Sequence, residues 1–127
     1  MKKTAIIFTL LTLLTVLFCG CVSSTPEYLY ISEVMSSNKS VLADENGNYS
    51  DWIELCNPTS EDINLKGYSL TDDSTEVDKF VFGSVVIKSK GCLVVFADGT
   101  TAYGLKGAQV HAPFKLSSKK GETVRLY

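Results

Sequence analysis

Three oxygen-bearing side chains in one short run are the first residues of this sequence that suggest chemistry. Asp44, Asn46 and Asn48 alternate within the segment DENGNYSD, and alternating carboxylate and amide oxygens are typical of a calcium-binding loop. In the EF-hand loop the glycine is the sixth residue and a bidentate glutamate the twelfth, whereas Gly47 is the fourth residue from Asp44. Asp and Asn beside Gly are common turn residues, so we interpret the segment as a turn.

Other metal-binding patterns are weak in this chain. A second acidic cluster lies between expected strands, and we interpret it as a solvated loop; it contains Asp72, Asp73, Glu76 and Asp78. The chain has one histidine and no CxxC pair, so the ligand sets of zinc sites are not formed at any usual spacing. We therefore predict neither a metal site nor another cofactor.

Residue types that could serve in catalysis occur in the chain, but not in the spacing of a known catalytic motif. His111 has no nucleophile beside it in the sequence, and Ser117 and Ser118 do not occur in a nucleophile-elbow pattern. The nine glycines are scattered at turn positions, and none belongs to a phosphate-binding GxxxxGK[ST] motif. We predict that the chain is not an enzyme and has no small-molecule substrate.

The strongest chemical signal lies at the N-terminus. Lys2 and Lys3 precede an uncharged apolar run over residues 4–18, and a glycine and a cysteine, Gly20 and Cys21, follow it. This order is typical of a secretory signal, and the Gly-Cys junction resembles a bacterial lipobox, at which the cysteine is lipidated and becomes the first residue after cleavage. We predict lipidation at Cys21, although Phe18 and Cys19 depart from the preferred residues of that motif.

Two other interpretations of this segment remain open: an uncleaved membrane anchor and ordinary secretion with cleavage elsewhere. The apolar run is at or below the length of about 17–25 residues that a spanning helix needs. All three interpretations export the chain, and lipidation would hold it at the extracytoplasmic face of a bacterial membrane. We accordingly divide the chain into a signal peptide (1–20), a polar tether (21–27) and one domain (28–127).

Charge narrows the choice of partners for this domain. Loss of Lys2 and Lys3 leaves ten basic against fourteen acidic residues, a formal charge of −4, so nucleic-acid binding is not favoured. The basic residues gather near the C-terminus, where a solvated face or an anion-binding patch would include Lys106, Lys115, Lys119, Lys120 and Arg125. The partners that remain are the membrane, reached through the lipid, a protein and a cell-surface polymer.

The remaining cysteines, Cys56 and Cys92, belong to the predicted domain. Disulfides persist in the compartments that an exported chain enters, so these two residues are candidates for a bond. Pairing depends on the distance between their backbones, which the sequence does not give. The alternative, two small half-buried strand residues, stays open.

Short β-forming segments separated by turn residues recur at intervals near ten residues. Within 51–57, Ile53 and Leu55 alternate with Trp52, which either covers a second core layer or offers an aromatic anchor to a partner. Gly67 suggests a bulge or a kink inside its segment. This spacing predicts an all-β, antiparallel, immunoglobulin-like sandwich with strands at 28–34, 51–57, 63–70, 80–82, 85–87, 92–97, 114–116 and 123–127.

Several motifs of this chain occur together, and in the same order, in a known family. They are YISEVMSSN (30–38), LADENGNYSDWIELCNP (42–58), LKGYSLTDD (65–73), GCLVVFAD (91–98), FKLS (114–117) and GETV (121–124). From about residue 28 to residue 127 the chain resembles bacterial lamin-tail domains.

The resemblance implies an immunoglobulin-like sandwich without catalytic residues of its own. It also implies an accessory role on exported or anchored proteins, often ahead of a CotH-like kinase domain or beside nucleases and phosphatases. Members usually continue past GETV with another strand, so we expect that the sequence is truncated at its C-terminus. We predict a membrane-tethered binding or spacer module, or else the accessory domain of an exported enzyme.

Overall fold

The computed structural model describes residues 26–100, 109–118, 121 and 123–127. In these ranges all regular structure is β, and no helix is present that would be long and apolar enough to cross a membrane. The strands, in chain order, are β1 (Tyr30–Met35), β2 (Asp51–Cys56), β3 (Ile63–Asn64), β4 (Ser69–Thr71), β5 (Phe80–Val81), β6 (Val86–Ile87), β7 (Cys92–Ala97), β8 (Val110–Ala112) and β9 (Arg125–Leu126).

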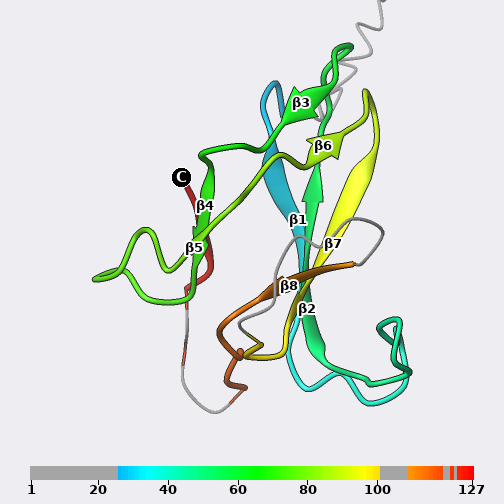
Figure 1. Ribbon diagram of the computed structural model, residues 1–127, viewed down its shortest axis with the longest axis vertical. Helices are drawn as coiled ribbons and strands as arrows, with labels where there is room; N and C mark the ends of the chain where they lie inside the picture. Colours follow the sequence, from blue (N-terminus) through cyan, green and yellow to red (C-terminus); the bar gives the residue numbers. More distant parts are fainter. Residues whose placement is uncertain (1–25, 101–108, 119–120, 122) are drawn as a thin grey trace, which may run out of the picture.

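The larger sheet has the strand order β1-β2-β7-β8 (Figure 1). β2 pairs with β1 and β7 in antiparallel fashion, and its register with β7 runs from Asp51 opposite Ala97 to Cys56 opposite Cys92. β7 and β8 are parallel, with Phe96 aligned to His111. A parallel pair needs a connection of a dozen or more residues, and twelve residues separate β7 from β8 in the sequence.

The second layer consists of short strands in two small sheets. β4 pairs with β5 on one side and β9 on the other, while β3 pairs with β6. Apolar residues of both layers form one buried cluster between them, which includes Ile53, Leu55, Leu70, Phe80 and Val95. Two packed β-layers around one core make this an immunoglobulin-like β-sandwich, as the strand spacing predicted.

The alternation within β2 is confirmed by the burial of its side chains. Ile53 and Leu55 are fully buried and belong to the core between the layers. Trp52 lies on the opposite face of the sheet, yet only 5% of its surface is exposed. Trp52 therefore belongs to a second buried layer and is not an exposed anchor.

The predicted antiparallel arrangement is wrong at β8. Residues 114–116 were expected to form a strand, but only Lys115 takes part in an isolated bridge, to Asp98, and the strand lies earlier in the chain. The segment expected at 63–70 divides into β3 and β4 at Gly67, whose φ of 93° few residues with a side chain adopt. The kink predicted at this glycine is confirmed.

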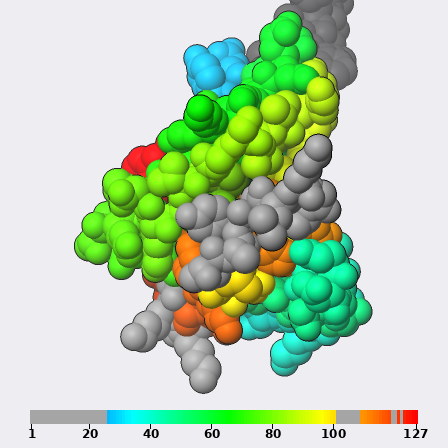
Figure 2. All heavy atoms as spheres, viewed as in Figure 1, coloured from blue at the N-terminus to red at the C-terminus, as the bar shows by residue number. Residues whose placement is uncertain are grey.

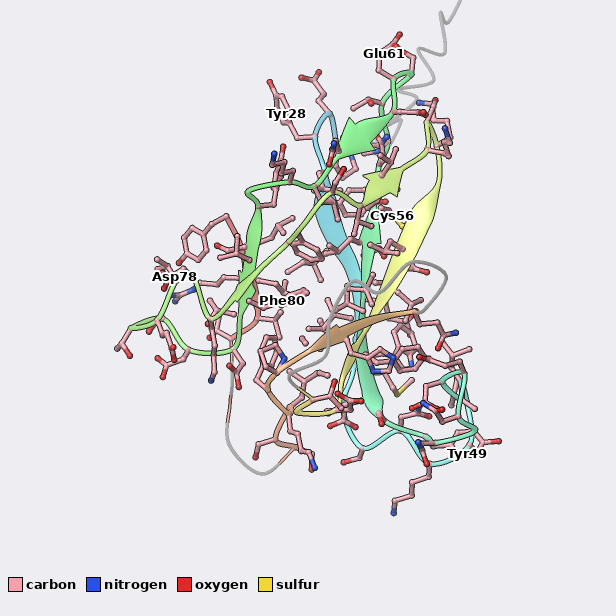
Figure 3. The ribbon with its side chains drawn as sticks, in the orientation of Figure 1. Tyr28, Tyr49, Cys56, Glu61, Asp78 and Phe80 are labelled. Atoms are coloured by element: carbon pink, nitrogen blue, oxygen red, sulfur yellow. A yellow bond between two sulfur atoms is a disulfide. The ribbon has the colours of Figure 1, made fainter. Side chains whose placement is uncertain are left out.

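One loop projects from an end of the sandwich. Residues 36–50 connect β1 to β2, and their later part forms a protrusion beside residues near 110 (Figure 2). Tyr28, just before β1, and Tyr49, in this loop, lie at opposite ends of the molecule (Figure 3). Asn38 fixes the base of the loop, because its side-chain amide donates to the carbonyls of Leu42 (2.6 Å) and Ser50 (2.8 Å).

Candidate functional site

A buried histidine lies between two carboxylates where this loop meets the larger sheet. His111 is on β8, 6% exposed, and its ring stacks on Phe96 of β7 at 5.5 Å between centroids. Its Nδ1 is 2.8 Å from Oδ2 of Asp98, just after β7. Its Nε2 is 3.1 Å from Oε2 of Glu45 in the projecting loop. Three chain segments thus meet at one imidazole.

The two carboxylate contacts of His111 favour its protonated form. An ionised carboxylate only accepts hydrogen bonds, so both ring nitrogens must donate, and only the imidazolium carries two N–H groups. Burial by itself lowers the pKa of His111, but hydrogen bonds and charge attraction from Asp98 and Glu45 outweigh it and raise the pKa above the ordinary value of 6.5. An imidazolium in this position has no lone pair with which to accept a proton from a nucleophile.

Asp44 organises the neighbouring turn. Its Oδ1 accepts the backbone N–H groups of Asn46 (2.9 Å) and Asn48 (2.8 Å), and the N–H of Gly47 donates to its carbonyl oxygen (3.0 Å). Burial raises the pKa of Asp44, yet the hydrogen bonds from Asn46 and Asn48 and the charge of His111 lower it overall. Asp44 therefore has the turn-forming role that the sequence predicted.

Asp98 is held in place by its own local contacts. Its Oδ1 accepts the N–H of Thr100 at 2.8 Å, which leaves Oδ2 directed at His111. Burial raises the pKa of this carboxyl, but the bonds from Thr100 and His111 lower it overall. Asp44, Asp98 and His111 each place a potential ligand atom within 4.8 Å of the other two. All three side chains take part in hydrogen bonds, and a protonated His111 supplies the positive charge that these carboxylates surround.

Sequence reasoning did not find this cluster. His111 was set aside because no nucleophile stands beside it in the sequence, and its two carboxylate partners are 13 and 66 residues away. The parallel pairing of β8 with β7 brings Asp98 close, and the fold of the loop brings Glu45. The only signal in the sequence was that a single histidine occurs in an acidic chain.

The two cysteines of the domain are joined by a disulfide in the structure. Cys56 and Cys92 are opposite each other on β2 and β7, on the face of the sheet that also carries Trp52. Cys56 is buried and Cys92 exposed. On the same face the Ser32 hydroxyl donates to Oε1 of Glu54 at 2.5 Å and lies 3.2 Å from the Cys56 sulfur.

The proposed basic patch is described only in part. Lys106, Lys119 and Lys120 lie outside the described residues, as does the predicted lipidation site Cys21. Lys115 borders a hollow with Asp51 and Asp98, whereas Arg125 borders a different hollow beside β1. The two described members thus line separate hollows, and Lys115 has acidic neighbours.

The hollow beside β1 is the larger of these two and is mainly apolar. Edge strand β1 and strand β9 form its walls, and it is lined by Leu29, Tyr30, Ile31, Val124, Arg125, Leu126 and Tyr127. A second hollow shares Tyr127 and adds Lys66, Gly67 and Tyr68. Exposed tyrosines around an apolar groove are typical of surfaces that bind other macromolecules.

Comparison with known proteins identifies one family. A sequence model described as Lamin Tail Domain matches residues 22–127, which include every described residue. No curated protein and no solved structure matches the chain.

Proposed function

Since the chain belongs to the lamin tail domain family, we propose that it is a non-catalytic module held at the extracytoplasmic face of a membrane by lipid on Cys21. Its role is either to bind a partner, which would be a protein or a cell-surface polymer, or to act as a spacer. The buried core and the disulfide give a rigid body, and His111 is engaged as a cation and not as a base.

The disulfide is the observation that best supports the proposal that the domain is exported. Bonds between cysteines persist outside the cytosol and are rare within it, so the bond between Cys56 and Cys92 suits an exported domain. It agrees with the basic and apolar start of the sequence, which ends at Gly20 and Cys21. Two features far apart in the chain, the disulfide and the N-terminal segment, thus support a location outside the cytosol.

A lipid on Cys21 would set the position of the domain. β1 begins at Tyr30, nine residues later, and nine extended residues reach at most about 30 Å. The domain would stay close to the bilayer, with the end at Tyr28 nearer to it. The loop that contains Tyr49 is at the far end (Figure 3) and would face away from the membrane.

The groove between β1 and β9 is the binding surface that we favour within this function. Both strands leave one edge without a strand partner in the described part of the chain, and unpaired edges can accept an added strand. Tyr30 and Tyr127 border the groove, and Arg125 places a cation there. A partner that combines apolar and acidic groups would suit this lining.

Palmitate labelling of cells that produce the full chain tests the anchor. We expect labelled protein in the membrane fraction, and loss of both label and membrane association in Cys21→Ser. Cys19→Ser is the matched control, because it removes a neighbouring thiol that the leader motif disfavours for lipidation, and it should label normally. Label that is unchanged in Cys21→Ser would refute the anchor, and an uncleaved leader would favour a spanning segment.

The resemblance to domains that stand ahead of CotH-like kinases or beside nucleases supports an alternative, in which the module is the accessory part of an exported enzyme. Its role would then be to position the catalytic part at the cell surface. The reading frame beyond the codon for Tyr127 distinguishes the two, since an in-frame catalytic domain would establish the accessory role.

A further inference from the structure

We propose that protonated His111 fastens the tip of the projecting loop, residues 44–48, to the larger sheet, and that loss of its proton releases this tip. The loop tip is defined by the turn that Asp44 organises. Through this device the surface at the end of the sandwich that carries Tyr49 would differ between acidic and alkaline surroundings.

The proposal rests first on the two ring nitrogens of His111, both of which must donate a hydrogen bond. His111 directs Nδ1 at Asp98 and Nε2 at Glu45, and a neutral imidazole can donate through only one nitrogen. When the proton leaves, one nitrogen presents a lone pair to a carboxylate oxygen about 3 Å away. That contact changes from attraction to repulsion.

The contact with Glu45 is the one that breaks. The Asp98 bond is shorter, at 2.8 Å against 3.1 Å, and the Asp98 side chain is 13% exposed against 38% for Glu45. Asp98 is also fixed by the N–H of Thr100, whereas the Glu45 carboxylate can turn into water. The remaining N–H therefore stays on Nδ1, and Nε2 faces Glu45 without a proton.

Few other described contacts tie the loop tip to the sheet. The N–H of Glu45 donates to the Gln109 side chain, which is exposed, at 2.9 Å. Asn38 holds the base of the loop through Leu42 and Ser50 and does not depend on His111. We therefore expect the tip to move while the base of the loop stays in place.

The charges around His111 set the direction of the switch. Asp98 faces it from the end of β7, and Asp44 and Glu45 face it from the loop. At the start of β2, Asp51 accepts the N–H of Asn38, and Lys115 runs along Gly99 after the bridge to Asp98. The carboxylates outnumber Lys115, so the pKa of His111 is raised from its ordinary value, and the tip is released as the pH rises through that pKa.

His111 is the only histidine of the chain, so its titration can be followed without assignment. The full chain, purified in detergent with EDTA and without a histidine tag, would be labelled with ¹³C-histidine and titrated by NMR. Hydrogen exchange of peptides that cover residues 40–50 would be measured over the same pH range and corrected for intrinsic rates. We expect titration above pH 6.5 and a fall in protection of about two- to fivefold through it, the range of a partly exposed ion pair.

Glu45→Gln tests the mechanism on a partly exposed residue, where the fold should tolerate the change. The amide of Gln can donate to the lone pair of neutral His111, so the pH-dependent loss of protection should disappear. Glu61→Gln, at the opposite end of the molecule (Figure 3), should leave the profile unchanged. Titration of His111 at or below 6.5, or loop-tip exchange that is the same on both sides of its titration, would overturn the proposal.

Discussion

Cys56 and Cys92 face each other across β2 and β7 with their Cα atoms 4.1 Å apart, and their sulfurs are bonded. The bond joins the two central strands of the larger sheet, at the end of β2 that is distant from the projecting loop (Figure 3). It encloses a segment that contains the whole of β3 to β6, so it constrains much of the second layer in the unfolded chain.

Removal of this disulfide should lower stability substantially. The two cysteines are 36 residues apart, and closure of such a loop corresponds to about 3–4 kcal/mol in the chain-entropy description. We expect the double variant Cys56→Ala, Cys92→Ala to lose a free energy of unfolding of this size in urea denaturation. Reductant should lower the wild-type midpoint and leave that of the double variant unchanged; equal responses would contradict the bond.

Stability should depend on pH through the His111 cluster. Because folding raises the pKa of His111, the stabilisation that its charge gives is complete below about 6.5 and is lost as the pH rises through the folded-state pKa. Folding lowers the pKa of Asp44 and Asp98, so their contribution is present above about 3.8 and is lost as the pH falls through their folded-state values.

Comparison of the wild type with His111→Gln isolates the alkaline part of the dependence of stability on pH. We expect the wild type to lose about 1 kcal/mol from weakly acidic to weakly alkaline pH, the size of a partly exposed charge-assisted hydrogen bond. Urea titrations at several pH values should give a flatter alkaline limb for the variant. A wild-type limb that rises with pH would contradict the predicted sign.

Asn57 should be a critical polar residue of the core. Its side chain is 1% exposed, and its amide nitrogen donates to the carbonyls of Glu61 (2.7 Å), Ile87 (3.2 Å) and Lys88 (3.2 Å). Asn57→Ala would leave the buried carbonyl of Ile87, and the partly buried carbonyls of Glu61 and Lys88, without this donor, so we expect a loss of about 2–4 kcal/mol in thermal or urea unfolding.

The control for this prediction is Asn64→Ala. Asn64 is exposed, and its side chain contacts the Ser84 hydroxyl and the N–H of Lys66. Water can replace these partners, so the change should cost at most about 0.5 kcal/mol. Equal losses in the two alanine variants would show that burial of the Asn57 amide is not the source of its effect.

Two lysine ion pairs should differ in their contribution to stability. Lys79 Nζ is 2.7 Å from Asp72 and 5.6 Å from the centre of the Phe114 ring, and the bond to Asp72 raises the pKa of Lys79. We expect Lys79→Met to destabilise the domain by about 1 kcal/mol, since it removes a partly buried ion pair and a cation–π contact.

Lys88→Met provides the comparison. Lys88 Nζ is 2.8 Å from Asp62, an equally short pair, but the Lys88 side chain is 79% exposed. Water and salt screen such a pair, so we expect no measurable change in the unfolding midpoint. A larger effect at Lys88 than at Lys79 would contradict the argument from burial.

The sequence predicted those parts of the fold that depend on neighbouring residues. The strand at Cys92–Ala97 was predicted with its observed bounds, because β-branched and aromatic residues run there between turn residues. Alternation predicted which side chains of β2 point into the core, since successive residues of a strand point to opposite faces. The break at Gly67 followed from the conformational freedom of glycine.

The arrangement of distant segments was decided only by the tertiary structure. Nothing local distinguishes a strand that returns parallel from one that returns antiparallel, so β8 and its pairing with β7 were missed. The bond between Cys56 and Cys92 depends on strand register, and the partners of His111 depend on how the end of β7 and the loop between β1 and β2 meet beside β8. The sequence by itself determined an all-β domain, because strand propensity and side-chain alternation are local properties, and the order of its motifs gave the resemblance to lamin-tail domains. The proton-holding cluster exists only in the folded chain, because its three carboxylates lie 13 to 67 positions away from His111 and only long-range packing brings them together.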